Sequence, residues 1–277
     1  MTGPAPFGPG PFLVDAHVHL YPRFDRAAFL DAAAANVRHA ARAHGLDADT
    51  PGWLLLTETA ADHAFAELAD QAAAGTGSGG WRLRATGDAL CLLAHRDGRA
   101  PLALLAGRQI VTEGGLEVLA LGTDATFPDG GTLADALAQV AAAGALAVLP
   151  WGFGKWLGAR GARVREVVAQ AAPGTLFLGD NGGRAGPRPR LLAEAEAAGR
   201  VVLPGSDPLP LPGQERRAGG FGFVLDGPLD PDRPAASLKA RLAALATSPP
   251  VYGRTTKALP FAANQIRMQL RKHGISP

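Results

Sequence analysis

Apolar runs and helix-like segments alternate along most of the chain. The continuous apolar runs cover residues 12–19, 52–59, 145–154, 174–183 and 200–209. Runs of this kind are typical of strands buried on both faces, as in parallel sheets covered by helices. The pattern therefore predicts an α/β fold with a mainly parallel sheet. Apolar residues at helical spacing predict helices over 25–45, 61–74, 131–144, 162–172, 188–199, 235–247 and 259–274.

The section from residue 81 to residue 121 departs from this alternation. It contains short strand-like runs joined by glycine-containing turns and leaves no room for helices. Such spacing predicts antiparallel hairpins or a meander. The pattern leaves open whether this section belongs to the main sheet or covers it.

Polar or unusual side chains stand where the predicted strands end. They occur at Asp15–His19, Glu58, Trp151, Asp180 and Asp207. In parallel barrels, the carboxyl ends of the strands form the functional face. This distribution predicts a TIM-like barrel, made irregular by the hairpin section. A doubly wound open sheet is the alternative, less favoured because no glycine-rich phosphate loop follows the first strand.

Length and composition predict one domain over residues 1–277. Hydrophobic residues make up 47% of the chain and charged residues 19%, which is enough for a packed core. Residues 1–11 are rich in Gly and Pro and predict an irregular N-terminal arm. The single cysteine, Cys91, excludes an internal disulfide and favours a reducing, cytoplasmic setting.

The charge and hydropathy of the chain argue against nucleic acid and membranes as partners. A formal net charge of +2 is too small to favour nucleic acid. A membrane span needs a nearly uncharged apolar run of about 18 residues, and we find none in the sequence. We therefore expect neither nucleic acid nor a membrane as a partner.

The first predicted strand carries the strongest chemical signal. Asp15, His17 and His19 alternate with apolar residues, so a regular strand would direct all three side chains to the same face. Two imidazoles at this spacing can bind one divalent ion, as in zinc sites. The alternative is a pair of histidines that hydrogen-bond within a polar mouth.

Two aspartates at later strand ends are the candidates for completing such a site. Asp207 follows a buried strand in the segment "LPGSDPL", and Asp180 follows the preceding strand in "FLGDNGGR". A carboxylate added to two histidines leaves coordination positions open for water and substrate. The alternatives are a capping aspartate for Asp207 and a turn aspartate for Asp180.

The order of these motifs resembles the PHP family, the polymerase and histidinol phosphatase group of metal-dependent phosphoesterases. The resemblance covers residues 12–210 and rests on "DAHVH", "LTET", "GRQIVT", "LEVLALG", "AVLPWGFG" and "GSDPL". It implies a distorted (β/α)7 barrel that holds up to three metal ions, which activate water against phosphate esters. His17, His19 and Asp207 match metal ligands of the family.

Other ligand positions of the family carry different residues in this chain. Thr59 and Trp151 stand at histidine positions, and Gln109 stands at the position of a bridging glutamate. Leu209 replaces the final histidine, and Glu117 stands where a histidine often occurs. The resemblance therefore implies a reduced site with one Zn, Mn or Fe ion rather than three, and the alternative is a site that holds none. Asp15 and Asp180 are further candidate ligands, and Glu58 or Glu117 is the candidate additional ligand or general base.

Basic residues follow three of the predicted strand ends. Lys155, Arg184, Arg216 and Arg217 are the candidates for binding an anionic, phosphorylated small molecule. The leading hypothesis is a metal-dependent phosphoesterase. A catalytically inactive PHP-like protein that binds a ligand or a partner is the second hypothesis. An amidohydrolase-type enzyme is the third, since that group also begins with His-x-His but normally supplies histidines from later strands.

Overall fold

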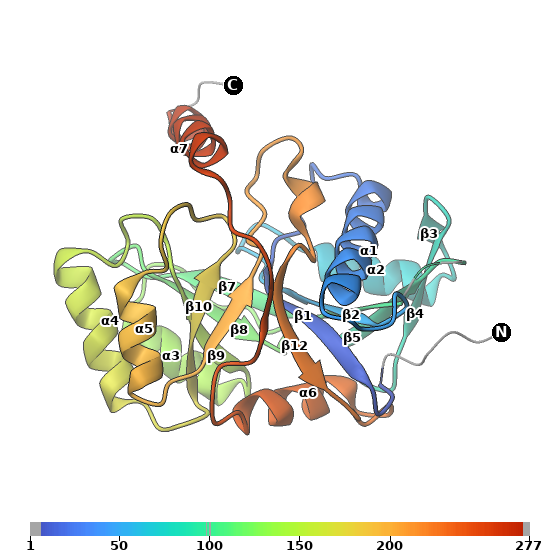
Figure 1. Cartoon of the computed structure of the whole chain (residues 1–277), viewed down its shortest axis with the longest axis horizontal. Coiled ribbons are helices and arrows are strands. Elements are labelled where there is room, and N and C mark those ends of the chain that lie inside the picture. The colour runs from blue at the N-terminus through green and yellow to red at the C-terminus, as the bar shows by residue number, and fades with distance from the viewer. Residues whose placement is uncertain (1–6, 98, 100, 274–277) are drawn as a thin grey trace.

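Two mixed β-sheets form the centre of the protein (Figure 1). The computed structural model describes residues 7–97, 99 and 101–273, so residues 1–6 of the predicted arm lie outside it. The larger sheet has eight strands in the order β13-β12-β1-β2-β6-β5-β4-β3. The smaller sheet has five strands in the order β11-β10-β9-β8-β7.

The strands are short and most are buried. In the larger sheet they are β1 (Pro11–Val18), β2 (Gly52–Leu56), β3 (Gly77–Ser78), β4 (Trp81–Ala85), β5 (Cys91–His95), β6 (Leu102–Leu105), β12 (Phe221–Asp226) and β13 (Val251–Gly253). In the smaller sheet they are β7 (Gly107–Val111), β8 (Glu117–Leu121), β9 (Leu146–Pro150), β10 (Leu176–Asn181) and β11 (Val202–Gly205).

The predicted closed barrel is wrong, because the two sheets remain separate. A strand has two hydrogen-bonding edges, and both edges of β1 are taken. The strand β12 pairs with it antiparallel over Pro11–Val14, and β2 pairs with it in parallel. Consequently β11 packs against β1 without pairing with it. At the other junction, a single isolated bridge between Glu58 and Arg108 joins the region of β2 to β7.

The section from 81 to 121 is shared between the two sheets. The strands β4, β5 and β6 pair antiparallel in the larger sheet, and β6 also pairs in parallel with β2. The strands β7 and β8 pair antiparallel in the smaller sheet. The chain changes sheets at Ala106, between β6 and β7.

Strand alternation divides the apolar core into three parts. Leu13 and Leu54 face a core shared with α1 and α2, whereas Val14 and Trp53 face the core between the two sheets. The outer face of the smaller sheet packs against α3, α4 and α5. The helices are α1 (Arg26–Ala43), α2 (Ala64–Ala73), α3 (Leu133–Ala142), α4 (Gly158–Gln170), α5 (Arg190–Ala197), α6 (Pro234–Ala243) and α7 (Ala258–Lys272), with a 3₁₀ turn η1 at Gln214–Arg217.

Two helices lie outside the layers beside the sheets. Figure 1 shows α6 across the lower end of the strands, where Leu238 and Leu242 close the core between the sheets. It also shows α7 beyond the opposite end, and most of its described side chains are exposed. None of the helices in the described part of the chain is sufficiently long and apolar to span a membrane.

Candidate metal centre

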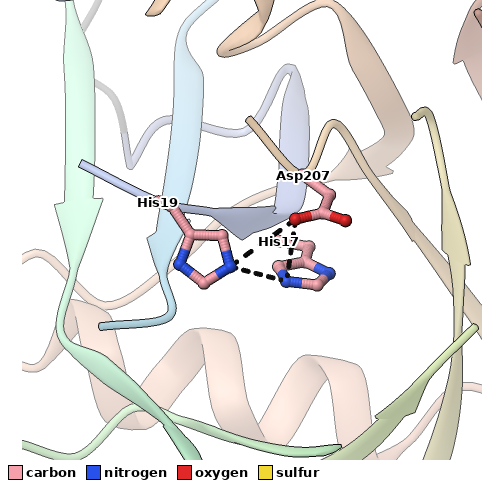
Figure 2. A group of neighbouring side chains, drawn as sticks. All are labelled: His17, His19 and Asp207. Carbon is pink, nitrogen blue, oxygen red and sulfur yellow. Dashed lines mark hydrogen bonds and ion pairs between the residues drawn. The ribbon is translucent and has the colours of Figure 1, made fainter. Parts of the chain in front are cut away.

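Three potential ligands converge where β1 ends and the segment after β11 begins (Figure 2). The Nε2 atoms of His17 and His19 lie 3.1 Å apart. Each of these atoms is 3.5 Å from Oδ1 of Asp207. Both histidines are buried, and the Asp207 side chain is 16% exposed. Two imidazoles and a carboxylate that point at one another form a donor set suited to a divalent ion.

A glycine allows β11 to approach β1 closely at this point. A Cβ atom on Gly205 would lie 2.4 Å from the Cβ of His17, so a larger residue would push β11 away from β1. The close approach lets the amide of Asp207 donate to the carbonyl of His17 over 2.8 Å. Asp207 itself has a φ of 47°, the left-handed region, which aspartate enters at low cost compared with bulkier residues.

Asn181 orients the carboxylate of Asp207 and was not among the predicted site residues. Its Nδ2 group donates to Oδ2 of Asp207, and its Oδ1 atom accepts from the amide of Gly183 over 2.5 Å. The second bond fixes which end of the amide faces the aspartate. Asn181 directly follows Asp180 on a strand, so their side chains point to opposite faces. The sequence drew attention to Asp180, whereas its neighbour reaches the cluster.

The surroundings of His19 and Asp207 shift their pKa values in directions that favour binding of a cation. Burial, and then the charge of His17, lower the pKa of His19 to about 3. Burial opposes ionisation of Asp207, but the neighbouring histidines, Asn181 and Lys155 bring its pKa below the usual range. A neutral His19 and an ionised Asp207 are the protonation states that metal binding requires. The His19 ring stacks on Tyr21 with centroids 5.2 Å apart, which holds the ring in place.

The metal-free protein should lose stability in mild acid because of His19. The unfolded His19 binds a proton below about pH 6.5, while the folded side chain stays neutral down to about pH 3. Lowering the pH through this window therefore favours the unfolded state, by about 1.4 kcal/mol per pH unit. Because the unfolded imidazole is only half protonated at pH 6.5, urea denaturation at pH 6.5 and pH 5.0 should show a fall about 1.6 kcal/mol larger than in His19→Gln. An equal fall in both proteins would contradict this assignment.

Asp15 does not join the other two residues of the first motif. The pairing of β1 with β2 shifts register between Asp15 and Val18, and the carboxylate is fully buried beside the backbone. It accepts from the amides of Ser206 and Gly219, each over 2.8 Å, and from the amide of His17 over 3.3 Å. Burial raises the pKa of Asp15 to about 7, against the opposing effect of these hydrogen bonds. Asp15 thus ties β1 to the segment between β11 and β12.

Glu58 is also committed to structural contacts. One oxygen accepts from the amide of Phe65 in the first turn of α2, over 2.6 Å. The other lies 3.0 Å from the guanidinium of Arg108. Burial raises the pKa of Glu58, with Arg108 and the Phe65 amide opposing the rise. This carboxylate caps a helix and pairs with an arginine, and it lies outside the ligand cluster.

The remaining predicted acids have cationic partners. Glu117 pairs with Lys155, whose charge acts on both Asp207 and His19. Asp180 pairs with the buried Arg184 at 2.6 Å and 3.0 Å. Glu117 and Lys155 therefore lie at the border of the cluster. Asp180 is instead shared between Arg184 and a second arginine, Arg188, at 3.7 Å. Among the other predicted cations, Arg216 is exposed and Arg217 is partly buried.

Comparison with known proteins shows a shared fold and no shared family. No protein-family model and no curated protein matches the sequence. Among solved structures, PsfC from Pseudomonas syringae PB-5123 aligns over 94% of this chain and 99% of its own, with a TM-score of 0.53 and 17% sequence identity. This similarity concerns the fold alone. Membership of the PHP family and the expected activity thus stay predictions.

Proposed function

We propose that this protein is a metal-dependent hydrolase that acts on a small anionic substrate, with a phosphate ester as the leading class. The observation that carries this proposal is the convergence of His17, His19 and Asp207 on one point. These three side chains would hold one Zn, Mn or Fe ion. When bound, such an ion supplies Lewis acidity, the means by which metallohydrolases activate water at neutral pH.

The chain's own residues have separable roles in this proposal. Asn181 holds the Asp207 carboxylate toward the two imidazoles, and Tyr21 holds the His19 ring. Glu117 is the acid at the border of the cluster, and its bond to Lys155 keeps a proton acceptor and a proton donor side by side. We assign Glu117 the role of general base in preference to Glu58, because Lys155 bonds to one oxygen of Glu117, whereas Phe65 and Arg108 occupy both oxygens of Glu58.

The competing candidate is a catalytically inactive protein that binds a ligand at the same place. Glu58 and Asp180, which could have supplied further ligands, are instead paired with Arg108 and Arg184. This pairing favours a mononuclear site or none. The two candidates differ in whether metal loading produces hydrolysis.

The deciding experiment measures metal content and hydrolysis on the same protein. Protein purified without chelator is analysed for Zn, Mn and Fe, then assayed with p-nitrophenyl phosphate and a panel of phosphorylated small molecules. We expect one ion per chain and activity that is lost in Asp207→Asn. The matched control is Asp97→Asn, which alters only an exposed pair with Arg82. Bound metal without hydrolysis of any phosphate ester would favour the inactive binding protein.

A further inference from the structure

Arg217 differs from the other cations in its surroundings. Every other Lys or Arg side chain that is at least partly buried in the described part of the chain has a carboxylate or backbone carbonyl partner. Arg217 is partly buried at the end of η1, yet its guanidinium has no hydrogen bond or ion pair within the described residues. Partial burial takes water away from the guanidinium, which is unfavourable unless a partner replaces that water, so this position favours an anion.

The backbone around Arg217 is fixed on both sides. The Nδ2 group of Asn36 donates to the carbonyls of Arg216 and Ala218, each over 2.9 Å. Two residues after Arg217, the amide of Gly219 donates to Asp15, which itself is two residues before His17. Arg217 is thus anchored to both α1 and β1, and its side chain starts from a preset position.

The same contacts place Arg217 beside the candidate metal centre. The amide of Gly219, two residues after Arg217, bonds to Asp15, and the amide of Asp207 bonds to the carbonyl of His17 in the same strand β1. Burial lowers the pKa of Arg217, and the charges of Asp207 and Asp15 oppose this, in keeping with that placement. Neither carboxylate bonds to it. The oxygens of Asp15 are occupied by three backbone amides, and those of Asp207 face the histidines and Asn181. The carboxylates attract Arg217 to the site without satisfying its donors.

The other predicted substrate-binding cations are less suited to this role. Lys155 is bonded to Glu117, and Arg184 is bonded through two nitrogen atoms to Asp180. Arg216 is exposed to solvent and has no desolvation to offset. A ligand anion would have to break an existing pair at Lys155 or Arg184, but not at Arg217.

We propose that Arg217 is an oxyanion-binding site that takes a phosphate or carboxylate group of the ligand next to the His17–His19–Asp207 cluster. The guanidinium presents donors in a fork that matches two oxygens of either group. The proposal rests on the proposed function for the identity of that ligand, and it assigns anion recognition to one residue among the four predicted.

Titration calorimetry with inorganic phosphate tests the site in metal-loaded protein. Loss of a charged hydrogen-bonding group should weaken phosphate binding in Arg217→Gln by about 10- to 100-fold. Arg217→Lys keeps the charge and should retain part of the affinity. The neighbouring Arg216→Gln is the matched control and should bind phosphate as the wild type does. Repeating the titration with acetate distinguishes a phosphate site from a carboxylate site.

Unchanged phosphate and acetate affinity in folded Arg217→Gln, or no binding of either anion by the wild type, would overturn the assignment. If Arg217→Gln does not fold, Arg217→Lys decides, and unchanged affinity for both anions there counts against the site. Metal content and hydrolysis are measured on the same samples, and the titration is repeated without metal. If the protein hydrolyses phosphate esters but binds the anions equally well without Arg217, only the proposed anion site is contradicted. If anion binding depends on Arg217 but the protein takes up no metal, only the hydrolase proposal is contradicted.

Discussion

Replacing His17 with alanine is expected to weaken divalent metal binding by more than about 100-fold, since even groups that only support a metal ligand contribute about 10- to 100-fold. His17 lies within 3.5 Å of both other members of the cluster, so its loss leaves two ligands. Metal content after dialysis, measured by mass spectrometry, and competition with a fluorescent chelator would quantify the effect.

An exposed histidine provides the comparison for this variant. His39 lies on the solvent side of α1, and His39→Ala should leave metal content unchanged. The metal assignment fails if His17→Ala retains the metal content of the wild type. It fails equally if wild-type protein takes up no Zn, Mn or Fe under conditions in which it remains folded.

The second large effect concerns stability. Asp15→Ala is expected to lower the free energy of unfolding by about 3–6 kcal/mol, because three buried amide donors lose their acceptor at about 1–3 kcal/mol each with partial relaxation. Many domains have a total stability of about 5–15 kcal/mol, so the variant should be close to its unfolding threshold. Urea denaturation followed by circular dichroism measures the loss.

A second aspartate gives the scale for this measurement. Asp25 is an exposed N-cap of α1 and accepts one amide, that of Ala28, over 2.7 Å. Asp25→Ala should therefore cost only about 1 kcal/mol. Similar losses in the two variants would show that Asp15 is not the buried acceptor described above.

The sequence predicted the helices and most of the buried strands of this fold, but it wrongly predicted that the strands close into a barrel. Continuous apolar runs identified the buried strands β1, β2, β9, β10 and β11, and helical spacing identified the seven α-helices of the described residues. The strand β12 was not predicted, because Gly222 weakens a short alternating run of Phe221, Phe223 and Leu225. That strand occupies an edge of β1 that a closed barrel would need, so one missed element changed the architecture.

In the candidate site, too, features set by neighbouring residues in the sequence were predicted, whereas contacts between distant residues were not. Local alternation was sufficient to bring His17 and His19 together, and the strand end at Asp207 supplied a third group. The ion pairs that the acidic residues form could not be predicted from local alternation. Glu58 has its partner on β7, and Asp180 turns to Arg184 while its neighbour Asn181 faces the cluster. Which acid is free to bind a ligand depends on cations positioned by the folded chain.

The contact between Gly205 and His17 has a consequence for how the protein assembles. Asp15 is hydrogen-bonded to Ser206 and Gly219, which follow it by 191 and 204 positions in the sequence. The cluster therefore depends on both halves of the chain. Contacts of such long sequence separation carry a high loop-closure cost and form only when intervening elements are in place. A metal ion bound to His17, His19 and Asp207 would therefore stabilise the docking of the segment after β11 onto β1. The rate of metal uptake during refolding would then report when this docking occurs.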